Sequence, residues 1–238
     1  MKVTIHQPEF APWLGFFDKV RQVDQLVLLD DVQFSKNYFH NRNRIRTAQG
    51  WSWITVPVAR SGLMTMINEV TIIRSKEDRW RSRIKRTVEQ AYAKAPAFLP
   101  NMEAFCRCLD SAETRLVDLN CCVLRWMVAS FDLSPRIIMS SDLDVEGSGS
   151  QRILEICTKV GATTYLSGIS GRDYLDLNSF SASGIEIQFQ EFYHPIYDQL
   201  QRDFEPSMSA IDALFMMGND AHSVLTEEWP HRMEKFFI

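Results

Sequence analysis

The chain has 238 residues, of which 45% are hydrophobic and 24% charged, and its formal net charge is −4. This hydrophobic share suits a substantial core, and the length suits one large domain or one domain with a helical insertion. The slight acidic excess argues against broad nucleic-acid binding, and no apolar run reaches the roughly 18 residues of a membrane span. With a strand-like start and no visible signal peptide, the sequence predicts a cytoplasmic protein.

The cysteines also favour a cytoplasmic protein. Their number is odd, and none has the CxxC spacing of a zinc or redox site: Cys106, Cys108, Cys121, Cys122 and Cys157. We therefore expect five reduced thiols that are dispensable for catalysis. Too few metal ligands can be placed together, so no metal site is expected.

The first sixty residues predict the opening of a doubly wound fold. Lys2–His6 is short and β-branched, as in a buried strand. Pro8 and Pro12 break this strand, a helix is expected to begin near Pro12 or Trp13, and residues 25–29 form a second buried strand. A strand, a helix and a second strand in this order indicate a mostly parallel sheet.

The α/β pattern is interrupted after the second strand and resumes near residue 136. Residues 41–58 form two alternating runs around Gly50, which predicts a β-hairpin within the region 37–75. A helical insertion is expected near 76–132, with breaks at residues 95–96 and 99–100. Further strands are expected at 136–139, 163–166 and 185–189, with a helix at 151–160. The sequence thus predicts a single α/β domain, Rossmann-like or nucleotidyltransferase-like, over residues 1–238.

Candidate catalytic residues lie where predicted strands end, since ligands bind at that edge of open α/β sheets. His6 ends the first strand and is expected to act as a general base, with Gln7 beside it holding the ligand. Asp30 follows the second strand and either binds substrate or caps a turn. Asp31 is expected to point to the opposite face. Asp18 and Lys19 are interpreted as a solvated helix face, and Trp13 as a core residue.

A dense polar run and the later strand ends supply candidate substrate-binding residues. In the run, alternate arginines suit a phosphate or carboxylate, whereas the competing interpretation is an exposed hairpin edge: His40, Asn41, Arg42, Asn43 and Arg44. Small and polar residues follow two later strands and suit backbone contact with an anion: Ser141, Ser167, Gly168, Ser170, Gly171 and Arg172. We expect His6, Asp30 and Arg42 to line one pocket.

Several strings resemble the WbqC-like family, and together they cover nearly the whole chain: HQP at residues 6–8, PWLGFFDK at 12–19, LDDVQF at 29–34, NRN at 41–43, GW at 50–51, SSDL at 140–143, YLSG at 165–168 and YL at 174–175. The resemblance implies a place in surface-polysaccharide synthesis and a role in transferring glycine or another acyl group to a sugar. A looser likeness, in fold, is to nucleotidyltransferase-like enzymes such as pantothenate synthetase, which join a carboxylate to an amine through an acyl-adenylate.

The resulting hypothesis is an acyl- or aminoacyltransferase that acts on a nucleotide-linked amino sugar in O-antigen synthesis. The alternatives are an ATP-dependent ligase and a pathway scaffold without catalysis. The expected ligand is a nucleotide sugar or an acyl donor. The sequence leaves open the donor, the acceptor, any cofactor, the use of ATP and the oligomeric state.

Overall fold

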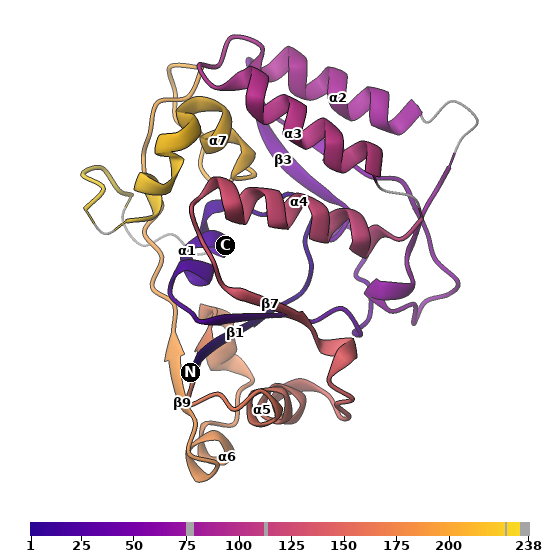
Figure 1. Cartoon of the computed structure of the whole chain (residues 1–238), viewed down its shortest axis with the longest axis vertical. Coiled ribbons are helices and arrows are strands. Elements are labelled where there is room, and N and C mark those ends of the chain that lie inside the picture. Colours follow the sequence, from indigo (N-terminus) through magenta and orange to yellow (C-terminus); the bar gives the residue numbers. More distant parts are fainter. Residues whose placement is uncertain (75–78, 112–113, 227, 234–238) are drawn as a thin grey trace.

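The computed structural model describes residues 1–74, 79–111, 114–226 and 228–233, and it is built around a five-stranded parallel sheet (Figure 1). The strands are β1 (Lys2–His6), β2 (Gln25–Leu28), β7 (Arg136–Met139), β8 (Thr164–Ser167) and β9 (Glu186–Phe189), in the order β7-β2-β1-β8-β9. The predicted α/β fold is confirmed. The strand order changes direction between β1 and β8, and this switch point is where ligands bind in such sheets.

Helices cover both faces of the sheet. Helices α1 (Leu14–Arg21) and α4 (Leu116–Ser130) pack on one face, and α5 (Gly149–Lys159) and α6 (Leu177–Ala182) pack on the other (Figure 1). Side chains along β2 alternate between the two faces of the sheet. Leu26 and Leu28 belong to the hydrophobic core under α1 and α4, and Val27 belongs to the core under α5 and α6. A strand buried on both faces reads as the continuous apolar run that the sequence shows.

The predicted hairpin is formed by β3 (Arg42–Thr47) and β4 (Gly50–Thr55). Gly50 follows the two-residue turn with a φ of +112°, a conformation that glycine adopts without steric cost. A second antiparallel pair, β5 (Val58–Ala59) and β6 (Thr71–Ile72), lies beyond it.

Between the hairpin and β7 the chain forms α2 (Arg79–Tyr92), α3 (Phe98–Ser111) and α4. Residues 76–78 and 112–113 of the predicted insertion lie outside the described residues. The break expected at 99–100 is wrong, because Pro100 lies in the first turn of α3. Backbone N–H groups in the first turn have no acceptor within the helix, so a proline there costs no hydrogen bond. All five cysteines are free thiols, as expected.

The remaining elements are short. They comprise one helix, α7 (Ile211–Met217), and 3-10 turns at η1 (Ile67–Glu69), η2 (Ser140–Asp142), η3 (Ile169–Asp173) and η4 (Gly218–Leu225). No helix within the described residues is long and apolar enough to cross a bilayer.

Candidate active site

A cavity of about 170 Å³ lies at the switch point, where β1 and β8 end side by side. We call it the switch-point cavity. Residues from the first helical unit, the hairpin approach and the ends of β8 and β9 line it: His6, Glu9, Trp13, Gly15, Phe16, Lys19, Tyr38, Phe39, Gly168, Ile169, Ser170, Gln190, Phe192 and Ser207. Three of these are candidates for proton chemistry: His6, Glu9 and Lys19.

Glu9 and Lys19 bring opposite charges into this cavity, and each is only 5% exposed. Burial raises the pKa of Glu9 to about 7, although Lys19 draws it down. Burial lowers the pKa of Lys19 to about 8, although Glu9 draws it up. Glu9 Oε2 is buried and accepts no hydrogen bond from the described residues. Near neutral pH, both groups are therefore poised to gain or lose a proton.

His6 lies at the carboxyl end of β1, as predicted, and its ring packs edge-on against Phe16 at 4.9 Å between centroids. Its Nδ1 is 2.9 Å from the carbonyl oxygen of Gln7, which can only accept, so Nδ1 carries the proton. Burial, helped by the charge of Lys19, lowers the pKa of His6 to about 3. The imidazole is thus neutral, and Nε2 is a hydrogen-bond acceptor but a weak base.

The interpretation of Asp18 and Lys19 as a solvated helix face is wrong. Asp18 is 3% exposed and accepts hydrogen bonds from Arg21 (3.0 Å) and from Gln190 (2.7 Å), which follows β9. The reason is tertiary, because the chain beyond β9 returns over α1 and covers the face that the helix alone would expose. Trp13 is also not a plain core residue, since it is half-buried and forms a wall of the cavity.

The indole of Trp13, which forms a wall of the cavity, leaves no room for a side chain at Gly15. A Cβ added there would lie 2.3 Å from the Trp13 indole. We expect Gly15→Ala to push the indole out of place, which should cost about 1–3 kcal/mol of stability and weaken ligand binding at least about tenfold. The matched control is Gly62→Ala, where a Cβ meets nothing within 4 Å. Calorimetric titration of both variants measures the difference, and equal affinities would contradict the role given to Trp13.

The β8 loop is divided between site and scaffold. Gly168 and Ser170 line the switch-point cavity, and their contact with substrate remains a prediction. Ser167 is 2% exposed, and its hydroxyl donates to the Gly168 carbonyl. A Cβ at Gly171 would lie 2.0 Å from Ser167 Oγ, so this glycine serves packing. The Arg172 guanidinium lies over Phe189 at 4.9 Å. Ser167, Gly171 and Arg172 do not line the cavity.

Gln7 and His40 bind each other. His40 is fully buried, its Nδ1 accepts from the Ser35 N–H (3.3 Å), and its Nε2 therefore donates to Gln7 Oε1 (2.8 Å). Burial lowers the pKa of His40 to about 4, so the ring stays neutral. The pair ties the end of β1 to the approach to the hairpin and does not line the cavity.

The two asparagines of the polar run hold loops together. Asn43 is 1% exposed and donates to the carbonyl of Ala11 at 2.8 Å. Ala11 has a φ of +48°, a left-handed conformation that this contact helps to hold. Asn41 donates to the carbonyl of Val56 (2.8 Å) at the base of the hairpin.

Arg42 and Arg44 share one face of β3, as predicted, and stack on the tryptophans of β4. The Arg42 guanidinium lies 4.1 Å from the ring centre of Trp53, and that of Arg44 lies 5.4 Å from the ring centre of Trp51. Phe39, which lines the cavity, packs 6.1 Å from Trp53. This face of the hairpin is therefore continuous with the rim of the cavity.

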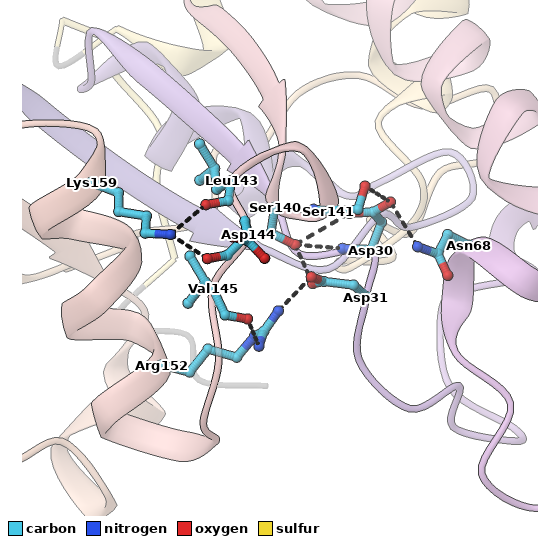
Figure 2. A network of polar contacts seen from close by, with 10 residues as sticks. All are labelled: Asp30, Asp31, Asn68, Ser140, Ser141, Leu143, Asp144, Val145, Arg152 and Lys159. Carbon is cyan, nitrogen blue, oxygen red and sulfur yellow. Dashed lines mark hydrogen bonds and ion pairs between the residues drawn. The ribbon is translucent and has the colours of Figure 1, made fainter.

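Asp30 takes part in a separate polar network (Figure 2). It is 2% exposed and accepts from the Ser141 N–H (3.0 Å), the Ser141 hydroxyl (2.8 Å) and Asn68 Nδ2 (3.3 Å). Asp31, paired with Arg152, also contacts Ser140, which lies 3.2 Å from Asp30. The expectation of opposite faces is wrong, because the chain leaves the strand geometry after Leu28. The network joins the ends of β2 and β7.

Comparison with known proteins shows the family of this chain. The family model described as the WbqC-like protein family matches residues 7–224. The chain belongs to the WbqC-like family. It is also 33% identical over 226 residues to the uncharacterized protein Rv1507c of Mycobacterium tuberculosis (strain ATCC 25618 / H37Rv), covering 94% of this chain and 97% of that protein. No solved structure matches the chain.

In this WbqC-like chain the expected common pocket of His6, Asp30 and Arg42 is not found. His6 lines the switch-point cavity, Asp30 and Ser141 line another cavity of about 570 Å³, and Arg42 lies on the hairpin. The sequence interpretation also missed Glu9 and the burial of Lys19. A usable signal existed: Glu9 interrupts an aromatic and proline-rich run, where a solvated charge is out of place.

Proposed function

We propose that the switch-point cavity transfers an acyl or aminoacyl group, such as glycyl, to the amine of a nucleotide-linked amino sugar during O-antigen or other surface-polysaccharide synthesis. The reaction class and the pathway come from the resemblance to the WbqC-like family. The observation that carries the proposal is the burial of Glu9 and Lys19 in one cavity at the switch point.

This pair suits amide formation. The amine nitrogen attacks the carbonyl carbon of an acyl thioester and forms the C–N bond, and Glu9, with a pKa of about 7, accepts the proton that the nitrogen must lose. The C–S bond then breaks, and the thiolate leaves with its electron pair. The Lys19 ammonium stabilises the negative charge that develops on the carbonyl oxygen or the leaving group. His6 Nε2 accepts a hydrogen bond from the amine and orients it. This assignment moves the general base from His6 to Glu9, because a base with a pKa of about 3 is too weak at neutral pH.

The size of the cavity limits what enters it. Pockets that enclose whole small molecules have volumes of about 300–1,000 Å³, so a cavity of about 170 Å³ holds only the reacting groups. The nucleotide then lies outside, across the rim formed by Tyr38 and Phe39. Arg42 and Arg44 are placed beyond that rim, where they suit the phosphates of the proposed substrate.

Arg42→Ala is expected to weaken nucleotide-sugar binding by about 1.5–3 kcal/mol, or roughly ten- to a hundredfold, because a charge-assisted phosphate contact is lost. Arg42→Lys should recover only part of this loss, since lysine lacks the planar fork. The control is Arg60→Ala, which removes an exposed arginine that also lies over an aromatic ring, Phe34, at 5.9 Å. Unchanged calorimetric affinity in Arg42→Ala would favour the alternative of a hairpin edge without ligand.

The proposed function is tested by thermal-shift measurements with coenzyme A, ATP and uridine diphosphate amino sugars, followed by mass spectrometry of reactions with acyl and glycyl thioesters. A ligand at 100 times its Kd stabilises the native state by about 2.7 kcal/mol. Stabilisation by an amino-sugar nucleotide and by coenzyme A, with N-acylated product, supports transfer. If product forms only with ATP, the protein is an ATP-dependent ligase instead. If no compound in the panel binds and no product forms, the non-catalytic pathway scaffold is the remaining alternative.

A further inference from the structure

The outer edge of β4 is an open strand edge. Val56 N–H donates to the Asn41 carbonyl at 2.8 Å, so this pair is a hydrogen-bonded pair of the β3–β4 ladder. Antiparallel pairs alternate, and the backbone groups of Trp51, Trp53 and Thr55 therefore point away from β3. Among the described residues, no hydrogen bond to these outward groups is found. An edge of this kind can accept a further strand.

Helix α2 runs beside this edge and forms a groove with it. The groove has a volume of about 580 Å³ and is lined on one side by residues 52–55 and 57 and on the other by one face of α2. That face presents Arg79, Arg83 and Thr87, each four residues apart, above the apolar side chains of Trp80 and Ile84. A groove between a strand edge and a helix is the arrangement in which extended peptides bind by strand addition.

The charge of the groove selects its occupant. Although the chain is acidic overall, α2 carries one acidic residue, Glu89, against a larger set of basic ones: Arg79, Arg81, Arg83, Lys85 and Arg86. Lys85 is paired with Asp110 at 2.6 Å, and neither it nor Arg81 or Arg86 lines the groove. Arg79 and Arg83 line the groove and are exposed. An acidic segment is attracted to this surface, whereas a second copy paired edge to edge would bring two copies of the same cationic helix together.

We propose that this groove binds an extended acidic segment of a partner protein, which adds as a strand to the edge of β4. The groove shares no lining residue with the switch-point cavity, so the inference does not depend on the proposed function. Backbone hydrogen bonds to Trp53 and Thr55 would supply affinity, and the exposed Arg83 would supply the preference for acidic side chains.

The test uses three labelled eight-residue peptides and fluorescence anisotropy at about 50 mM salt, where charge attraction is only weakly screened. One peptide alternates glutamate and valine, the second alternates lysine and valine, and the third is the acidic peptide with alternate amides N-methylated. We expect the acidic peptide to bind at least about tenfold more tightly than either of the others. Equal binding of the N-methylated peptide would overturn strand addition, and no binding of the acidic peptide would overturn the proposal.

Matched variants locate the binding on the protein. Arg83→Glu should weaken the acidic peptide at least about tenfold, whereas Arg86→Glu, on the same helix but outside the groove, should change it less than about threefold. Thr55→Pro removes an outward N–H without touching the β3 ladder and should also abolish binding. Equal losses in Arg83→Glu and Arg86→Glu would show diffuse attraction, and concentration-dependent dimers lost in Thr55→Pro would show self-pairing; either result overturns the proposal.

Discussion

Glu9→Gln is expected to lose the proposed transferase activity and to gain stability at alkaline pH. The proton acceptor is removed, so kcat should fall by roughly 10²–10⁴. Glutamine keeps the size of the side chain but leaves no charge to bury. A residue whose loss stabilises the fold while stopping the reaction is typical of an active site rather than of the scaffold.

The direction of the stability effect follows from the pKa. Glu9 has a pKa of about 7 in the folded chain, against a reference value of 4.5. Below pH 4.5 it is protonated in both states, and between 4.5 and 7 only the unfolded chain gives up its proton, so wild-type stability falls as pH rises. Above pH 7 the penalty is complete, at about 3 kcal/mol. The stability advantage of Glu9→Gln should therefore grow across this window and then level off.

Urea unfolding of wild type and Glu9→Gln at pH 4 and pH 8 measures this difference, and Glu146→Gln provides an exposed control that should show none. Lys19→Met adds an independent readout. It removes the charge that lowers the Glu9 pKa, so the rising limb of the pH–activity profile should move to higher pH. A Glu9 pKa near 4.5 by NMR titration would contradict both expectations.

Asp212→Ala is expected to destabilise the chain by about 3–5 kcal/mol, because it leaves several buried hydrogen-bond donors unsatisfied at about 1–3 kcal/mol each. Asp212 is fully buried, and its carboxylate accepts from Tyr92 (2.7 Å), Tyr197 (2.7 Å) and Gln199 (2.9 Å). Alanine would leave all three donors without this acceptor. The network joins α2, α7 and the chain between β9 and α7.

The midpoint of urea unfolding checks this value, with Asp220→Ala as an exposed aspartate control. Tyr92→Phe should cost less, about 1–3 kcal/mol, although it also leaves the Arg46 N–H without its 3.0 Å acceptor. If Asp212→Ala unfolds at the wild-type urea concentration, the network contributes nothing to stability.

The sheet could be predicted because its signals are local. The prediction for β1 matches the structure at both ends, as does that for β7, since short apolar runs between turn residues have few alternatives. The hairpin followed from alternation around Gly50, which also placed the arginines opposite the tryptophans. The predicted single domain and the proposed substrate contacts remain predictions.

The site was only partly predictable. His6, Gly168 and Ser170 line one cavity because strand ends meet at one edge of the sheet, and their role in binding or catalysis remains a prediction. Glu9 and Lys19 were missed because their burial depends on packing from distant segments. Local polarity was equally misleading for Asn43 and His40, whose polar atoms are used by loops and by each other.

By itself, the sequence determined the α/β class, the parallel strands, the hairpin and the family, because each depends on hydrophobic periodicity or on short local motifs. Only the tertiary structure decided which polar residues share a cavity. A side chain's role depends on what covers it, and coverage comes from segments far away in the chain: Gln190 from beyond β9 seals Asp18, and Ser141 after β7 holds Asp30. Burial then sets the pKa values of Glu9 and Lys19, because desolvation penalises a charge wherever the fold removes water.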